Sequence, residues 1–206
     1  MNGDPPQPRT GTWKRFAMVL SALGSAPLIA GFTFLFLSHL MAHGTLFLLF
    51  SATGVLFAGI LPVLLTIYWS MLVRNIPYDI PEKGDRTWLL VMVIVSYGIG
   101  SAAFILLHAP WLITALMVCY CTNTTIVLLI NHWWKISVHA MGIAGPMAIM
   151  VFAVGPPGLL LFVFLVPVMW SRVYLQRHTP GQVVLGALLG CLLTAVQVFL
   201  MRPVLS

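Results

Sequence analysis

Acidic residues are almost absent from this chain. Its 206 residues hold four carboxylates against ten lysines and arginines, and only 7% of the residues are charged. The carboxylates are Asp4, Asp79, Glu82 and Asp85, so three of the four lie within one short segment. A two-metal catalytic centre needs carboxylate ligands held from several parts of a fold, which this distribution does not offer. We therefore expect no metal and no cofactor.

Cysteine is also scarce. Cys119, Cys121 and Cys191 all lie in apolar stretches and show no paired spacing of the kind that binds a metal. We expect them to be small buried hydrophobic residues that form neither disulfides nor a zinc site.

Apolar residues dominate what remains. They make up 60% of the chain, and the mean hydropathy is +1.02. Several apolar runs approach the roughly 20 residues that a helix needs to cross a bilayer. This predicts an all-α fold, a polytopic transmembrane helix bundle, with a polar tail at 1–15 and a single transmembrane domain at 16–206. The predicted spans are seven, at about 16–39, 45–73, 87–107, 111–131, 138–154, 157–173 and 180–201.

Proline and glycine punctuate these spans. Pro27 and Pro62 fall inside the first two and predict kinks that neighbouring helices can tolerate. The segment Gly155-Pro-Pro-Gly158 predicts a tight turn. Closely spaced glycines favour close helix packing. These are Gly142, Gly145, Gly186 and Gly190.

Positive charge is distributed unevenly between the two sides of such a bundle. With seven spans, segments 1–15, 74–86, 132–137 and 172–179 share one face. Nine of the ten basic residues fall there, namely Arg9, Lys14, Arg15, Arg74, Lys83, Arg86, Lys135, Arg172 and Arg177, which leaves Arg202 for the other face. Short basic loops stay in the cytoplasm, so this face is predicted to be cytoplasmic, although topology alone also explains such a cluster.

Two histidines on the basic face are predicted to lie at helix starts. Lys135, Ser137 and His139 surround the start of the fifth span. His178 precedes Thr179-Pro180, which reads as a helix cap followed by proline in the first turn. Free amides and the positive end of a helix dipole favour a bound anion such as phosphate.

Two imidazoles beside several cations suit phosphoryl transfer by covalent catalysis. A neutral histidine can attack phosphorus, and a protonated one can give its proton to the leaving oxygen. Fixed cations can stabilise the remaining phosphate oxygens. This chemistry needs no metal.

The spacing of these residues resembles the type-2 phosphatidic acid phosphatase superfamily, whose motifs are K-x6-R-P, P-S-G-H and S-R-x5-H-x3-D. Ser171-Arg172, His178 and Gln182 keep every spacing of the third motif and depart only at the last position. Ser137 and His139 match the second motif, which here lacks its proline and glycine. For the first motif only Arg86 matches, since Thr87 replaces the proline and Asp79 the lysine. The resemblance spans about 79–190.

The resemblance implies a six-helix phosphatase-like core and a role for each matching residue. His178 would be the nucleophile, forming a phosphohistidine, and His139 the general acid. The phosphate-binding residues implied are Arg172, Arg86 and Ser137, together with Lys83 or Lys135. Gln182 stands where the family has an aspartate that orients the nucleophile. Thr179-x-x-Gln182 also reads as a capping box, and the two roles are compatible.

The expected function is that of a metal-independent membrane lipid phosphate phosphatase. With no soluble domain to hold a polar substrate, the site should accept an amphiphile whose tail stays in the bilayer. Isoprenoid mono- or diphosphates are favoured over glycerolipid phosphates because the loops carry few polar residues besides the phosphate set. A lipid phosphotransferase and a non-catalytic anionic-lipid-binding protein remain alternatives. The expected partners are the bilayer and the substrate lipid, with no nucleic acid, and homo-oligomerisation stays open.

Overall fold

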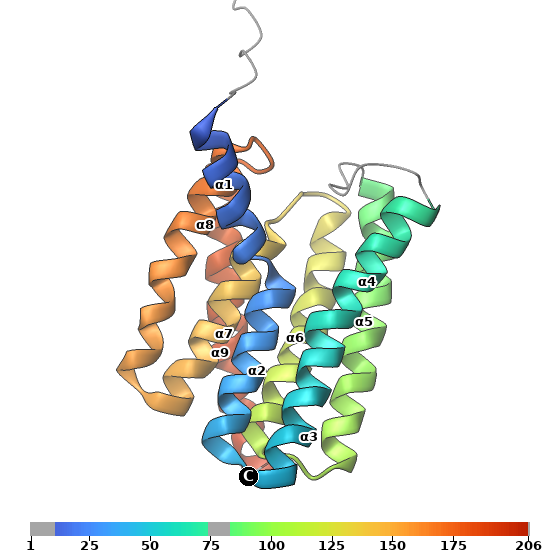
Figure 1. The fold of residues 1–206 in the computed structure, drawn as a ribbon, viewed down its shortest axis with the longest axis vertical. Coiled ribbons are helices and arrows are strands. Elements are labelled where there is room, and N and C mark those ends of the chain that lie inside the picture. The colour runs from blue at the N-terminus through green and yellow to red at the C-terminus, as the bar shows by residue number, and fades with distance from the viewer. Residues whose placement is uncertain (1–10, 74–82, 206) are drawn as a thin grey trace, which may run out of the picture.

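Helices joined by short turns account for the part of the chain that the computed structural model describes, residues 11–73 and 83–205 (Figure 1). The helices are α1 (Thr12–Leu23), α2 (Ala26–Met41), α3 (Gly44–Gly54), α4 (Leu61–Ile67), α5 (Lys83–Leu106), α6 (Trp111–Asn131), α7 (Val138–Val154), α8 (Phe162–Tyr174) and α9 (Pro180–Leu205). The π-helical segments η1 (Val55–Ile60) and η2 (Tyr68–Val73) continue α3 and α4, and a 3-10 turn, η3 (Pro156–Leu161), leads into α8. The all-helical fold class is confirmed.

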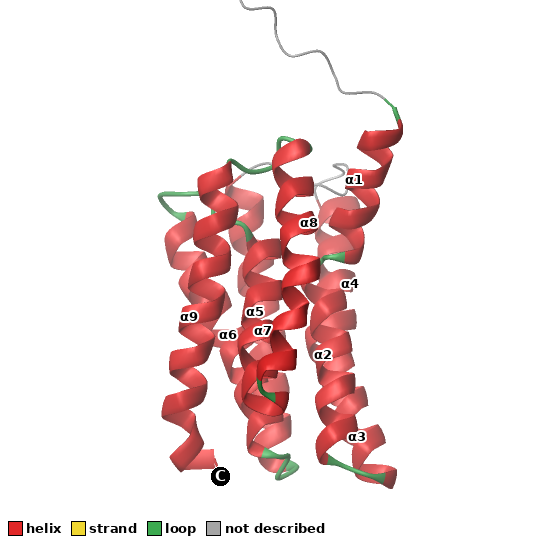
Figure 2. Ribbon diagram, turned by 90° about the vertical axis from the view of Figure 1, so that its left-hand side faces the viewer, coloured by secondary structure: helices red, strands yellow, loops and turns green. Residues whose placement is uncertain are grey.

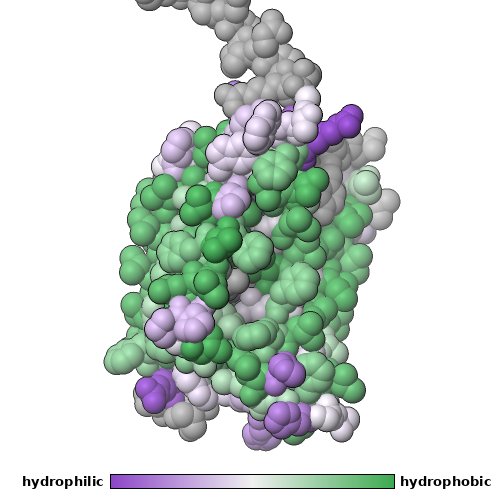
Figure 3. All heavy atoms as spheres, turned by 60° about the vertical axis from the view of Figure 1, so that its left-hand side comes forward, coloured by the Kyte–Doolittle hydropathy of each residue, from purple (hydrophilic) through white to green (hydrophobic). Residues whose placement is uncertain are grey.

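Five of these helical stretches are long and apolar enough to cross a membrane. They are Gly44–Met71, Arg86–Leu106, Trp111–Asn131, Pro156–Tyr174 and Pro180–Arg202. The pair α1 and α2, bent by 46°, adds a sixth if it counts as one span. The face drawn in Figure 3 is mostly apolar over the middle of the helices and more hydrophilic at both ends. The protein is therefore a multi-pass membrane protein.

The predicted number of seven spans is not confirmed, because α7 is short. It has 17 residues, which at 1.5 Å per residue gives about 26 Å, less than the hydrocarbon thickness of about 30 Å. Every residue from 140 to 150 in α7 is buried. A helix that is apolar on all sides and buried on all sides is surrounded by protein rather than by lipid. It packs against α2, α6, α8 and α9, and thus forms the centre of the bundle (Figure 2).

The first predicted span is broken close to its proline. α1 ends at Leu23, and α2 begins at Ala26 with Pro27 in its first turn, where a missing N–H costs nothing. The helix also begins earlier than expected, at Thr12, so the last residues assigned to the polar tail are helical. Pro62 produces no break of this kind, since Gly44–Met71 runs through it as one span. The π-helical segment η1 ends two residues before Pro62.

The glycine pairs pack helices closely, as predicted. A Cβ placed on Gly186 would lie 2.7 Å from the carbonyl oxygen of Ser137, and one on Gly190 would lie 2.6 Å from that of Met141. Real Cβ atoms do not approach backbone oxygens so closely, so only glycine permits this contact between α9 and α7. A Cβ on Gly142 would similarly meet Ala26 of α2 at 2.4 Å.

Polar side chains inside the bundle bond to one another. The side-chain amide of Asn123 on α6 donates to the hydroxyl of Thr194 on α9 (2.9 Å) and accepts from the amide of Gln197 (2.7 Å). Such bonds join transmembrane helices where unsatisfied polar groups would be costly. Of the three cysteines, Cys119 is buried and the other two are half-buried.

The connections alternate between the two ends of the bundle, as predicted. The start of α1 and the turns at 132–137 and 175–179 lie at one end, here called the basic end (Figures 1 and 2). The turns at 42–43 and 107–110 and the end of α9 lie at the other. The sequence therefore placed the described loops correctly relative to one another, while residues 74–82 of the predicted loop 74–86 lie outside the described residues.

Replacing Gly186 by alanine should destabilise the protein, because the added methyl group meets the backbone oxygen of Ser137 and forces α7 and α9 apart. We expect a loss of about 1–3 kcal/mol in the free energy of unfolding, measured by denaturation in detergent. Gly98→Ala is the matched control, because a Cβ at Gly98 meets nothing within 4 Å. Equal stability of the two variants would contradict the packing described here.

Candidate active site

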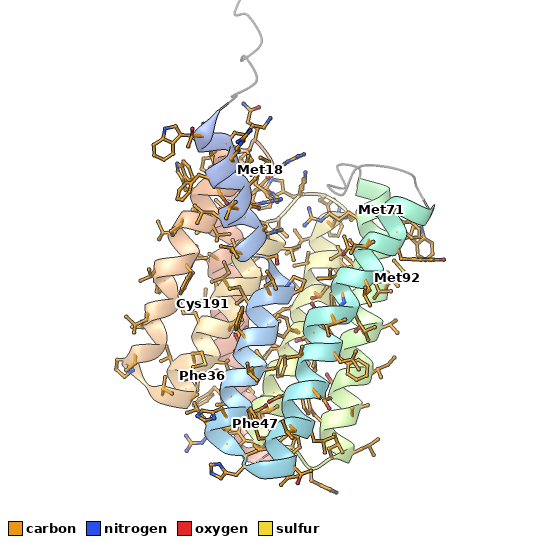
Figure 4. All side chains as sticks on the ribbon, viewed as in Figure 1. Met18, Phe36, Phe47, Met71, Met92 and Cys191 are labelled. Atoms are coloured by element: carbon orange, nitrogen blue, oxygen red, sulfur yellow. The ribbon has the colours of Figure 1, made fainter. Side chains whose placement is uncertain are left out.

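Four ionisable side chains, three from different helices and one from the turn before α9, converge at the basic end. Arg86 comes from the first turn of α5, His139 from the first turn of α7, Arg172 from the last turn of α8, and His178 from the residues just before α9. Both histidines lie within electrostatic range of both arginines, and the two arginines repel each other. Figure 4 shows side-chain nitrogen atoms, drawn in blue, grouped at this end of the bundle, and the label of Met18 on α1 marks the region. We call these four residues the His–Arg cluster.

His178 is buried in the turn between α8 and α9. Its side chain is 8% exposed, and its backbone N–H donates to the carbonyl of Arg172 at 3.3 Å. Burial and then the positive charge of Arg172 lower the pKa of His178 to about 4, against an opposing hydrogen bond from Gln182. The imidazole is therefore neutral at physiological pH.

Gln182 bonds both the imidazole and the helix start. Its side-chain oxygen lies 3.2 Å from Nδ1 of His178 and accepts the backbone N–H of Thr179 at 3.1 Å. The hydroxyl of Thr179 in turn accepts the backbone N–H of Gln182 at 3.4 Å, which completes a capping box. Because an amide oxygen only accepts, the proton of the neutral imidazole belongs on Nδ1. The other ring nitrogen, Nε2, then keeps its lone pair.

The start of α7 is joined to the start of α9. The backbone N–H of Ser137 donates to the carbonyl of Gln182 at 3.3 Å, and its hydroxyl accepts the N–H of Ala140 at 3.4 Å as the helix cap. Ser137 is fully buried and its carbonyl lies against Gly186. A hydroxyl oxygen that accepts one bond still has its own hydrogen to donate. These contacts fix His139, two residues further on, relative to His178.

Arg86 connects α5 to the same region. One of its Nη atoms donates to the carbonyl of Ile136 at 2.6 Å, so the turn at 132–137 is tied to the first turn of α5. The side chain is half-buried. A guanidinium has five N–H donors, so this single bond leaves capacity for an anion.

Arg172 has a partner that the sequence did not indicate. Its Nη1 donates to the hydroxyl of Ser21 at 2.8 Å. Ser21 lies on α1, far from every motif, and is 7% exposed. A serine in an apolar helix carries no pattern that predicts such a contact, so sequence reasoning missed it.

Of the two lysines expected to bind the phosphate, the structure describes the side chain of Lys135 only. Lys135 is half-buried and its charge acts on His178, although more weakly than those of the two arginines. The side chain of Lys83 lies outside the described residues.

The surface beside His178 is hollowed. An open depression of about 340 Å³ is formed by the turn between α8 and α9 and the residues next to it. Its lining consists of Val173, Gln176, Arg177, His178, Thr179 and Gln182. His178 can thus be reached from this depression, although the residue is only 8% exposed.

The protonation of His178 predicts a pH dependence of stability. Its pKa of about 4 lies below the usual 6.5, so the unfolded chain binds the additional proton as the pH falls. The contribution of neutral His178 is fully present above about pH 6.5 and is lost towards pH 4. The melting temperature of the wild type should therefore fall between about pH 6.5 and pH 4, and His178→Gln should reduce this fall. His43→Gln, at an exposed position on the opposite end, is the control, and equal slopes for His178→Gln and wild type would contradict the prediction.

Among residues 11–73 and 83–205, no three His, Cys, Asp or Glu side chains gather in a geometry that could hold a metal ion. Comparison of the chain with protein-family models, with curated proteins and with solved structures found no match. The functional argument therefore starts from the His–Arg cluster and its surroundings.

Proposed function

We propose that this protein is an integral-membrane phosphatase that hydrolyses lipid phosphates through a phosphohistidine at His178. The observation that carries the proposal is the convergence of two histidines and two arginines, from three helices and the turn before α9, at one end of an apolar bundle. These are the residues at which the sequence resembles the type-2 phosphatidic acid phosphatase superfamily. We further propose that the chain is a divergent member of it.

In the first step of the proposed reaction, Nε2 of His178 attacks phosphorus. The bond from phosphorus to the lipid oxygen breaks, and His139 gives that oxygen a proton, so that a lipid alcohol leaves. In the second step a water molecule attacks the phosphohistidine while His139 takes its proton. Inorganic phosphate leaves, and both histidines return to their starting states.

The arginines explain why phosphate would bind here. Arg86 and Arg172 repel each other across a partly buried site, and a phosphate dianion between them replaces that repulsion with attraction. The same dianion favours a protonated imidazole nearby, which is the form that His139 needs as a general acid. Substrate binding would thus prepare the acid.

The surroundings favour a lipid as the carrier of the phosphate. The site lies at the end of helices whose middle surface is apolar (Figure 3). An amphiphile in the bilayer can present its phosphate at this level while its tail stays in hydrocarbon. Isoprenoid phosphates remain the favoured substrates within this class.

The presence of glutamine instead of aspartate at position 182 favours one competing function, that of a non-catalytic protein that binds anionic lipid. A neutral amide supplies no charge to stabilise a histidine that becomes positive, as the aspartate of the family would. The geometry nevertheless gives His178 the tautomer that attack requires. A third possibility, phosphotransfer, differs only in that an alcohol replaces water in the second step.

Substituting the two histidines tests the proposal. In detergent micelles containing isoprenyl or glycerolipid phosphates, His178→Ala should abolish phosphate release. His139→Ala should slow it by about 10²–10⁴-fold, the usual contribution of a general acid. His132→Ala is the matched control, since His132 is exposed at the same end.

The outcomes separate the candidate functions. No phosphate release by the wild-type protein, together with lipid binding, would favour the non-catalytic binder. Wild-type activity that survives His178→Ala would rule out the phosphohistidine. A new lipid phosphate formed when an alcohol is supplied would indicate a transferase.

We also infer that seven segments cross or enter the membrane, namely the five long apolar stretches, the bent pair of α1 and α2, and α7. We infer in addition that the basic end faces the cytoplasm. The support is the excess of lysine and arginine at that end. Because α7 is enclosed by other helices, its short length does not expose its ends to lipid.

Cysteine labelling tests this orientation. In a variant in which the three native cysteines are replaced, Arg177→Cys should resist a membrane-impermeant thiol reagent in intact cells and react after permeabilisation. His43→Cys, exposed at the opposite end, should react in intact cells. Labelling of Arg177→Cys from outside would reverse the orientation.

A further inference from the structure

The first helix reaches into the His–Arg cluster through Ser21. Its hydroxyl accepts a hydrogen bond of 2.8 Å from Nη1 of Arg172, between residues 151 positions apart. α1 lies outside the part of the chain that resembles the phosphatase superfamily. The contact therefore belongs to this chain's own architecture.

Contacts on both sides of Ser21 hold α1 against α8. Three residues after it, a Cβ on Gly24 would lie 2.1 Å from a methyl group of Val168, so the backbone of the elbow between α1 and α2 touches α8 directly. Before it, Trp13 and Phe16 pack against Trp170 with ring centroids 6.4 and 6.2 Å apart. The hydroxyl is thereby held in place by packing that does not involve Arg172.

The spacing of these contacts explains their register. Gly24 caps the end of α1, three residues after Ser21, and Val168 lies one turn before Arg172 on α8. Residues three or four apart share a helix face. One face of α1 thus meets one face of α8, and the glycine allows the approach that brings the hydroxyl to the guanidinium.

A neutral acceptor suits an arginine that must bind phosphate. A carboxylate at this position would form an ion pair and compete with the substrate, whereas a hydroxyl adds no negative charge beside the guanidinium. The hydroxyl still restricts the orientation of a long side chain that would otherwise sample many rotamers. A guanidinium that is already held in one orientation loses less freedom when a ligand binds to it.

We propose that Ser21 is a positioning residue for phosphate binding, which orients the guanidinium of Arg172 from the first helix. This inference rests on the proposed function, because it assumes that Arg172 binds the phosphate of the substrate. It adds a residue that none of the three motifs contains. It also makes α1 part of the site rather than an additional membrane anchor.

The test compares Ser21→Ala, Ser21→Thr and a control in purified protein. Orthovanadate is the probe, because it resembles the transferring phosphoryl group, and its affinity is measured from the rise in melting temperature with concentration. Ser21→Ala should bind vanadate about 3- to 10-fold more weakly and raise KM for lipid phosphate, because the guanidinium loses one contact that orients it before binding. Ser21→Thr keeps the hydroxyl and should stay within about twofold of wild type.

Ser38→Ala is the matched control. Ser38 is a fully buried serine on α2, and its hydroxyl has no hydrogen-bond partner among the described residues. Its replacement should leave vanadate affinity unchanged. A general effect of removing a buried hydroxyl would affect both alanine variants equally.

The failure of this inference differs from failure of the proposed function. If the wild type binds vanadate and Ser21→Ala binds it equally well, Ser21 does not position Arg172. Loss of affinity in Ser21→Thr as large as that in Ser21→Ala would also overturn the inference, because the hydroxyl is then not the cause. If the wild type binds no vanadate and releases no phosphate, the proposed function itself fails, and the inference fails with it.

Discussion

The close approach of α7 and α9 is the constraint on which the arrangement of the candidate site depends. Gly186 and Gly190 bring the backbone of α9 against the carbonyl oxygens of Ser137 and Met141. At the same end, the N–H of Ser137 donates to the carbonyl of Gln182. One histidine follows the start of α7 and the other precedes α9, so the separation of these helices determines the separation of the two imidazoles. A single added methyl group in the interface would change both.

Hydropathy predicted where the helices lie, but it did not predict the break between α1 and α2 or the burial of the short α7. Every predicted span contains helix, because apolar runs of this length have few other ways to satisfy their backbone in a membrane. The break after Leu23 lies near Pro27, and the backbone of Gly24 at this break lies against Val168. The short α7 is permitted by the helices around it. Contacts between distant segments of this kind leave no local signal in a sequence.

The same limit applies to the candidate site. Spacing alone indicated His178, Arg172 and His139, because motif positions near helix starts follow from local sequence. The distinct roles of Arg86 at the carbonyl of Ile136 and of Ser21 at Arg172 depend on where distant helices meet. Lys135 was placed at the same end correctly, yet only the folded arrangement shows that its charge acts on His178 more weakly than the charges of Arg86 and Arg172.

Gln182 illustrates how a departure from a motif can keep geometry and change electrostatics. Its oxygen receives the N–H of Thr179 through the helix cap, and this bond holds the same oxygen beside Nδ1 of His178. The tautomer of the imidazole is therefore fixed by helix capping, which needs no charge. Without a carboxylate the buried imidazole stays neutral, with a pKa of about 4, so its lone pair is available over the whole physiological range. In the proposed reaction the negative charge arrives with the phosphoryl group, and Arg86 and Arg172 are the cations that hold it. A neutral partner for His178 is therefore compatible with the proposed reaction, in which the phosphoryl group of the substrate brings the negative charge next to the imidazole.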